Sequence, residues 1–230
     1  MKAVVLAGGL GSRLWPLTQV IPKPLLPIGE KSVLEIQLGH LKNHGFDEVV
    51  IATNYKSDLL ESYFGDGSKW GVKLRFSKES RSLGTAGPLS LLRSELREPF
   101  LLLNGDILTN LDFGALLEHH RGRTVSMTVA TKQLSYPLRY GNVRTEGDRL
   151  LDIEEKPELS VEIVAGIYAI NPSVLEHIPD DTCIGMDELI NKLLQIHEPI
   201  GVYKISAYWL DIGQLDDFKQ AQDVYEHHFK

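Results

Sequence analysis

Two segments near the beginning of the sequence have the composition of a phosphate-binding site. The apolar run 3–7 leads into Gly8-Gly9-Leu10-Gly11-Ser12-Arg13, and Lys23 follows between two prolines. Glycines let backbone N–H groups come close to phosphate oxygens. Arg13 and Lys23 add positive charge, and the prolines restrict the backbone that carries Lys23. We expect a nucleoside triphosphate to bind here.

The glycine spacing matches neither of two common nucleotide motifs. It lacks the Walker pattern Gly-x-x-x-x-Gly-Lys-Ser/Thr, and two adjacent glycines stand where a dinucleotide fold has Gly-x-Gly-x-x-Gly. The glycines alone suit a tight strand-to-helix turn equally well. The basic and proline residues that follow favour the phosphate site.

Two aspartates follow short apolar segments. Asp106 comes directly after the run 101–105, and Asp211 follows Tyr208-Trp209-Leu210. Open α/β sheets bind ligands at the carboxyl ends of their strands, and carboxylates can hold Mg²⁺ there together with phosphates. Each aspartate alone is also compatible with a turn or helix N-cap. Together with the glycine loop they favour a metal site.

These residues require a framework of strands and helices. Apolar runs at 49–52, 72–76, 100–103 and 125–129 predict strands, and the segments 33–43, 56–64, 85–92 and 112–119 between them predict helices. This alternation predicts an α/β fold with a mostly parallel sheet covered on both faces.

The pattern changes after residue 130. Segments 141–145, 150–155 and 162–170 predict closely spaced strands, and 172–177, 186–197 and 214–227 predict helices. We expect the strands to be antiparallel additions to the same sheet. With no Pro/Gly/Ser-rich linker, residues 1–230 are interpreted as a single domain. Leu189, Leu193 and Ile196 predict a core face or a subunit interface, which leaves a homo-oligomer open.

Composition and net charge limit the binding partners and the cellular compartment that we expect for this protein. The formal net charge is −7, with 43% hydrophobic and 24% charged residues. This acidic balance argues against binding to nucleic acid or a membrane surface. The single Cys183 and the lack of an apolar leader predict a cytoplasmic protein. Because the sequence ends shortly after its last expected helix, we expect no second catalytic activity.

The sequence resembles the sugar-1-phosphate nucleotidyltransferases, and in particular their mannose- and heptose-1-phosphate guanylyltransferase-like branch. The resemblance lies in the order and spacing of segments 6–14, 22–24, 83–87, 104–106, 140–143, 154–157, 165–168 and 209–213. It implies a Rossmann-like, three-layer, GT-A-like fold and Mg²⁺ held by Asp106 and Asp211. Residues 1–130 would bind the nucleotide and residues 131–230 the sugar phosphate.

The resemblance also implies the roles of individual residues. Arg13 would bind the triphosphate and stabilise the departing pyrophosphate, and Lys23 would hold the attacking phosphate. The implied nucleotide-binding residues are Leu6, Ala7, Gly8, Gly9, Gly11, Ser12, Glu79, Gly84 and Thr85, and the implied sugar-phosphate-binding residues are Asn104, Gly141, Glu155, Lys156 and Gly166. Without the resemblance, Glu155 and Lys156 would be interpreted as a surface ion pair, and Gly141 as a turn residue.

The sequence constrains the identity of the nucleobase and of the sugar less than it constrains the reaction class. A carboxylate accepts well from the adjacent N–H donors of guanine, so Glu79 favours guanine, unless Glu79 is a solvated loop residue. The related enzymes usually have Asn where this sequence has Val164, which leaves the sugar open. We expect guanylyl transfer to a mannose-type hexose or heptose 1-phosphate. The alternatives are uridylyl or thymidylyl transfer to another sugar 1-phosphate, and a nucleotide-sugar sensor without turnover.

Overall fold

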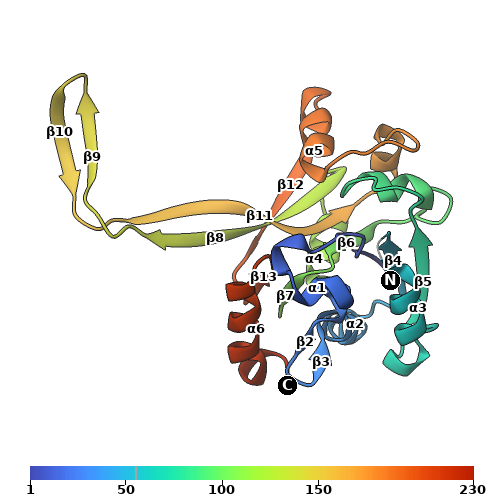
Figure 1. Cartoon of the computed structure of the whole chain (residues 1–230). Coiled ribbons are helices and arrows are strands. Elements are labelled where there is room, and N and C mark those ends of the chain that lie inside the picture. Colours follow the sequence, from blue (N-terminus) through green and yellow to red (C-terminus); the bar gives the residue numbers. More distant parts are fainter. Residues whose placement is uncertain (55) are drawn as a thin grey trace.

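The main β-sheet takes its seven strands from both halves of the chain (Figure 1). The computed structural model describes residues 1–54 and 56–230. Across the sheet the order is β12 (Ile200–Ile205), β8 (Met127–Pro137), β11 (Glu158–Ile170), β6 (Phe100–Asn104), β1 (Lys2–Leu6), β4 (Glu48–Thr53) and β5 (Lys73–Lys78). Strand β11 runs antiparallel to β8 and β6, and the other neighbours run parallel. The predicted mostly parallel sheet is confirmed.

Helices cover both faces of this sheet and give three layers. The α-helices are α1 (Leu17–Val20), α2 (Val33–Asn43), α3 (Ser57–Phe64), α4 (Phe113–Arg121), α5 (Met186–Gln195) and α6 (Leu215–His228). The 3₁₀-helices are η1 (Ser12–Leu14), η2 (Lys23–Leu25), η3 (Ser68–Trp70), η4 (Gly87–Leu92) and η5 (Pro172–His177). In the part of the chain that the structure describes, no helix is long and apolar enough to cross a bilayer.

Alternation along the buried strands creates a separate core on each face. In β1, Ala3 and Val5 pack with residues of α2, α3 and α4, whereas Val4 faces η4, η5 and α5. Successive side chains of a strand point to opposite faces, so a fully buried strand supplies both cores. Leu189 and Leu193 belong to the second core, while Ile196 is exposed.

A third core lies beneath α6 and joins the beginning of the chain to its last helix. It contains Leu14, Leu26, Ile28, Val33, Ile36, Leu108, Leu210, Ile212, Ala221 and Tyr225. Two small sheets belong to this region: β2 (Pro27–Ile28) with β3 (Lys31–Ser32), and β7 (Ile107–Thr109) with β13 (Trp209–Asp211). The loop that carries Lys23 and the strand that carries Asp211 therefore share one packed unit.

Three details differ from the sequence-based expectations. The predicted strands 141–145 and 150–155 form β9 (Asn142–Glu146) and β10 (Arg149–Glu154), which pair with each other and not with the main sheet. They lie at the end of a long ribbon formed by β8 and β11 (Figure 1). The edge strand β12, which the sequence analysis did not predict, runs parallel to β8. The predicted helices 85–92 and 172–177 are short 3₁₀-helices, each with a proline in its first turn.

Helix α2 has the bounds that the sequence predicts, because its first turn is capped. The Ser32 hydroxyl accepts from the Glu35 N–H at 3.3 Å, and the Glu35 carboxylate accepts from the Ser32 N–H at 2.7 Å. This reciprocal capping box satisfies two N–H groups that a helix otherwise leaves unpaired. At the other end His44 is the C-cap residue, and Gly45 follows with a φ of 81°.

We expect Ser32→Ala to lower the free energy of unfolding by about 1 kcal/mol, because it removes the N-cap acceptor. For a chain of this size the melting temperature should fall by roughly 2–4 °C. Thermal unfolding followed by circular dichroism measures this shift. Ser62→Ala, at an exposed position within α3, is the matched control. Equal melting temperatures for the two variants would contradict the capping role.

Candidate active site

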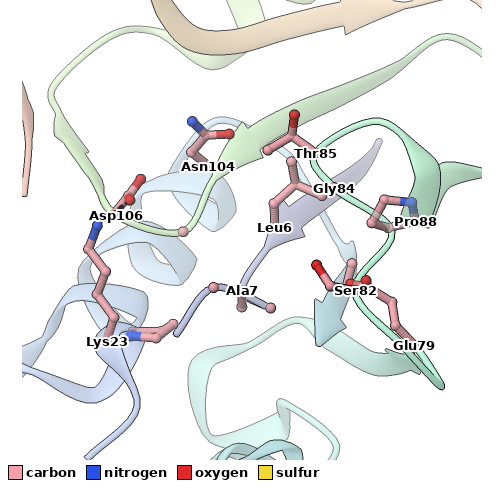
Figure 2. A pocket seen from close by; sticks show the side chains of 15 residues that line it. Leu6, Ala7, Lys23, Glu79, Ser82, Gly84, Thr85, Pro88, Asn104 and Asp106 are labelled. Atoms are coloured by element: carbon pink, nitrogen blue, oxygen red, sulfur yellow. Dashed lines mark hydrogen bonds and ion pairs between the residues drawn. The ribbon is translucent and has the colours of Figure 1, made fainter. Parts of the chain in front are cut away.

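A pocket of about 280 Å³ lies at the carboxyl ends of β1 and β6 (Figure 2). Its lining includes Leu6, Ala7, Gly8, Gly9, Lys23, Glu79, Gly84, Thr85, Asn104 and Asp106. An adjoining hollow shares Gly8, Gly9, Lys23 and Asp106 with it and adds Gly11, Ser12, Arg13 and Gly213. All the residues predicted to bind the nucleotide therefore line one continuous depression.

The glycine loop is held in place by a buried threonine. The Thr18 hydroxyl donates to the Gly11 carbonyl at 2.7 Å, and Thr18 is 1% exposed. Gly11 has a φ of 61°, and a Cβ there would lie 2.9 Å from the Thr18 methyl group. Only glycine easily adopts this positive φ and also leaves room for the Thr18 methyl group. The turn then places Arg13 beside Gly213, since a Cβ on Gly213 would lie 3.7 Å from the Arg13 guanidinium nitrogens.

Lys23 and Asp106 form an ion pair at one side of the pocket (Figure 2). Their side chains are 11% and 24% exposed, so the pair is mostly shielded from water. Asp106 lies two residues after the end of β6, as the sequence predicts. The Lys23 ammonium is a compact charge with three donors, so it can hold a carboxylate and a phosphate together.

Asp106 and Asp211 are brought together by the backbone. In the β7–β13 pair, Asp211 stands opposite Ile107, and the Ile212 N–H donates to the Asp106 carbonyl at 3.0 Å. Burial, and then repulsion by Asp106, raise the pKa of Asp211 to about 6, while Lys23 and Arg13 act in the opposite direction. Within the described residues, Asp106 Oδ1 and Asp211 Oδ1 are buried without a hydrogen-bond partner.

Sequence reasoning missed Gln37, which holds the loop that carries Asp106. Its side-chain amide donates to the Asn104 carbonyl at 2.9 Å and to the Ile107 carbonyl at 2.8 Å. Gln37 is 3% exposed and lies on the buried face of α2. A polar residue on the apolar face of the predicted helix 33–43 was the available signal, because a buried amide needs partners.

Glu79 lies at the opposite side of the pocket from Lys23 (Figure 2). Its Oε2 accepts from the Leu83 N–H at 2.8 Å, and its Oε1 would lie 3.0 Å from a Cβ on Gly8. Burial raises the pKa of Glu79, and the Leu83 hydrogen bond opposes this shift. One carboxylate oxygen therefore fixes the loop 79–83, and the other is directed toward the glycine loop.

Gly84 and Thr85 connect the pocket to the second core. A Cβ on Gly84 would lie 2.5 Å from the Ile184 carbonyl, and the φ of Gly84 is 79°. The Thr85 hydroxyl accepts from the Met186 N–H, the first of α5, at 2.8 Å. Both residues therefore have structural roles in addition to lining the pocket.

The predicted sugar-phosphate residues divide into two groups. Asn104 lies in the pocket, and a Cβ on Gly166 would lie 2.7 Å from the Asn104 side-chain nitrogen. Gly141, Glu155 and Lys156 lie instead at the distal end of the β8–β11 ribbon (Figure 1). The structure does not bring this second group to the pocket of its own chain.

Comparisons with known proteins agree with this architecture. Residues 2–228 match the model of the nucleotidyl transferase family. The chain belongs to the nucleotidyl transferase family. A rice protein of this kind, probable mannose-1-phosphate guanylyltransferase 1, is 36% identical over 98% of the chain, which spans 64% of the length of that relative. A UTP–glucose-1-phosphate uridylyltransferase of Synechocystis is 35% identical over 96% of the chain and 62% of its own length.

The family fold also appears among solved structures. A putative glucose-1-phosphate thymidylyltransferase from Bacillus anthracis, crystallised with sucrose, superposes with a TM-score of 0.80 at 25% identity. The match covers 99% of this chain and 96% of the other. The expected nucleotidyltransferase fold is confirmed.

We expect Gln37→Met to lower the free energy of unfolding by roughly 1–3 kcal/mol, because the Asn104 and Ile107 carbonyls lose their donor inside the protein. Denaturant unfolding measures the change. Gln195→Met, at an exposed position in α5, is the control. If both variants match the unsubstituted protein, Gln37 does not hold this loop.

Proposed function

We propose that this chain joins a nucleoside triphosphate, with GTP favoured, to a sugar 1-phosphate and releases pyrophosphate. The observation that carries the proposal is the pair of adjacent, half-buried carboxylates, Asp106 and Asp211, beside Lys23 and Arg13. This cluster adjoins a glycine loop whose backbone can approach phosphates. The name of the rice relative supports guanylyl transfer to mannose 1-phosphate, so we favour a mannose-type hexose or a heptose.

Asp106 and Asp211 fit a divalent cation. Each has a buried carboxylate oxygen that lacks a hydrogen-bond partner in the described part of the chain, and oxygen is the donor that Mg²⁺ prefers. No group of three or more His, Cys, Asp or Glu that could hold a metal occurs among the described residues. Phosphate oxygens would therefore complete the coordination. A bound Mg²⁺ would neutralise phosphate charge and orient the substrates.

The reaction needs positioning more than proton transfer. An oxygen of the sugar phosphate attacks the α-phosphorus, the bond from that phosphorus to the β-phosphate bridging oxygen breaks, and pyrophosphate leaves with the electron pair. The attacking phosphate is already ionised, so no general base is required. Arg13 would stabilise the leaving pyrophosphate, and Lys23 would hold the attacking phosphate against the repulsion of the triphosphate.

The two parts of the chain would divide the substrates between them. Within a single domain, residues 1–130 would supply the glycine loop and Glu79 for the nucleotide. Residues 131–230 would supply the sugar-phosphate groups other than Asn104. Glu79 Oε1 would accept from the base, since Oε2 already binds the Leu83 N–H. The free, exposed Cys183 is consistent with a reducing cytoplasm.

We expect pyrophosphate release when GTP, UTP and dTTP are tested against mannose, heptose and glucose 1-phosphates with Mg²⁺, with the highest rate for GTP. UTP and dTTP are included because similar proteins carry uridylyl- and thymidylyltransferase names. Chelation of the metal should abolish release. Nucleotide binding without release in every combination would support a sensor and contradict the proposed enzyme.

We expect Arg13→Ala and Asp106→Asn each to lower kcat/KM by roughly 10²-fold or more, because each removes charge stabilisation from the reacting phosphates. Arg123→Ala and Asp223→Asn, both at exposed positions, are the matched controls. Circular dichroism checks that the variants are folded. Near-normal rates in folded Arg13 and Asp106 variants would refute their assigned roles.

We expect Glu79→Gln to lower the ratio of kcat/KM for GTP over UTP by about tenfold, because a charged acceptor of the guanine N–H groups is lost. Glu176→Gln, exposed and remote from the pocket lining, is the control. An unchanged ratio would show that base choice does not depend on this carboxylate.

A further inference from the structure

A long arm, residues 133–164, projects from the sheet (Figure 1). Strand β12 accompanies β8 only as far as Lys132, and β6 accompanies β11 only from Ile167. Between these limits β8 and β11 continue as a two-stranded ribbon, with Pro137 paired to Glu158 at its distal end. The β9–β10 hairpin follows as a sheet of its own. The arm is therefore built as a two-stranded structure beyond the edge of the main sheet.

The arm exposes a large apolar surface. Its exposed large apolar side chains are Tyr136, Tyr140, Val143, Leu150, Leu151, Ile153, Leu159, Val161 and Val164, with exposures from 42% to 80%. An isolated two-stranded hairpin is marginally stable in water, and long exposed apolar strands are a liability that proteins cover. The composition of the arm therefore indicates that another surface covers it.

The tip of the arm has the character of a binding site. A Cβ on Gly141 would lie 3.1 Å from Glu155 Oε2, so these two residues are neighbours, and Lys156 follows directly. Lys156 has a φ of 49° although it precedes Pro157. This conformation is costly for a side-chain-bearing residue, and such strain is concentrated at functional sites. The Lys156 side chain is 68% exposed, so packing within its own chain does not explain the strain.

Arg13 is the cation assigned to the triphosphate, and the other cations that line the pocket and its adjoining hollow are held in ion pairs. Lys23 is paired with Asp106, and the Arg81 guanidinium pairs with Asp181 at 3.0 Å. A triphosphate and a sugar phosphate together bring several negative charges. Lys23 is then the one cation assigned to the sugar phosphate, and a further cation on that side would offset more of the substrate charge. Lys156, whose ammonium lies 4.0 Å from its exposed neighbour Glu155, would supply it. The extended strand from Gly166 to Glu158, however, places the tip roughly 25 Å away.

We propose that two copies of this chain exchange arms, so that Glu155 and Lys156 of the partner subunit complete the sugar-phosphate side of each pocket. This inference rests on the proposed function. It brings the tip residues Gly141, Glu155 and Lys156 to the pocket residue Asn104 and its neighbour Gly166. The sugar 1-phosphate then binds between two subunits, and a separated chain has only half of its site.

A second copy is the occupant that the structure favours. An exchange of identical arms gives a closed two-fold dimer, and each arm covers the other subunit reciprocally. Stable interfaces use roughly 20–30 residues a side, which is close to the length of the arm. Exposed apolar residues also lie on the loop beside the pocket, where Leu10 is 59% and Trp15 is 54% exposed. They offer an apolar counterpart to the surface of an incoming arm.

Cross-linking tests the exchange without reference to activity. In a Cys183→Ser background, which removes the exposed native thiol, Ser12→Cys and Lys156→Cys are combined in one chain and treated with a short bismaleimide in dilute solution. We expect covalent dimers at twice 25.8 kDa. Cross-linked monomers would show that the arm folds onto its own pocket, and absence of any product would show that the tip reaches neither pocket. Either result overturns the proposal.

The apolar surface of the arm is tested by the mass of the unlabelled protein in light scattering. We expect a dimer for the unsubstituted chain and a monomer for Leu150→Asp combined with Ile153→Asp. Val202→Asp, at an exposed apolar position on β12 outside the arm, should remain a dimer. A monomeric unsubstituted chain would contradict the exchange.

Complementation tests the shared site directly. Arg13→Ala removes a functional group of the pocket, and Lys156→Ala removes a functional group of the arm. Each variant alone should therefore be nearly inactive. Co-expressed at equal levels, they should recover about a quarter of the normal activity, because half of the dimers are mixed and each mixed dimer has one intact site. Arg13→Ala with Asp106→Asn, which both break the pocket, should recover none.

The two proposals fail in different ways. If the unsubstituted protein releases no pyrophosphate with any substrate pair, the proposed function fails, while cross-linking and mass still decide the exchange. If the unsubstituted protein is active but the Arg13→Ala and Lys156→Ala mixture stays inactive, each arm serves its own chain or none, and the exchange is overturned.

Discussion

The backbone of this protein forces two carboxylates together beside its glycine loop. Pairing of β7 with β13, and the hydrogen bond from Ile212 to the Asp106 carbonyl, fix Asp106 and Asp211 as neighbours. Burying two like charges side by side is unfavourable, which the raised pKa of Asp211 reflects. Such an arrangement is stabilised by cations, and Lys23 and Arg13 supply part of that charge. A divalent ion together with phosphates would supply the rest.

The remaining fold can be understood as support for this cluster. Parallel strands β1 and β6 end at the same edge of the sheet, so the glycine loop and the Asp106 loop meet there. Helix α2, with its capped first turn, holds Gln37 beneath the Asp106 loop. The third core fastens α6 and β13 to the segment that carries Lys23. Positive and negative groups from distant parts of the sequence are thus held by packed elements.

Patterns among neighbouring residues predicted those parts of the structure that short-range interactions determine. The apolar patterns predicted the bounds of α2, the buried strands and the position of Asp106 after β6. Pairing partners depend on contacts between distant segments, so β9 and β10 were assigned to the wrong sheet and β12 was missed. Gln37 was overlooked because its two acceptors lie about seventy residues away in sequence. The separation of Gly141, Glu155 and Lys156 from the pocket likewise depends on the direction of the β8–β11 ribbon, which is not a local property of the sequence.

The most direct test of the central claim is the stoichiometry of Mn²⁺ binding, measured by electron paramagnetic resonance with GTP present. Mn²⁺ replaces Mg²⁺ at oxygen sites and gives a signal that separates free from bound ion. The two carboxylates predict one tightly bound Mn²⁺ per chain in the presence of GTP, and marked weakening in Asp211→Asn with the fold intact. The same stoichiometry and affinity in Asp211→Asn as in the unsubstituted protein would contradict the account.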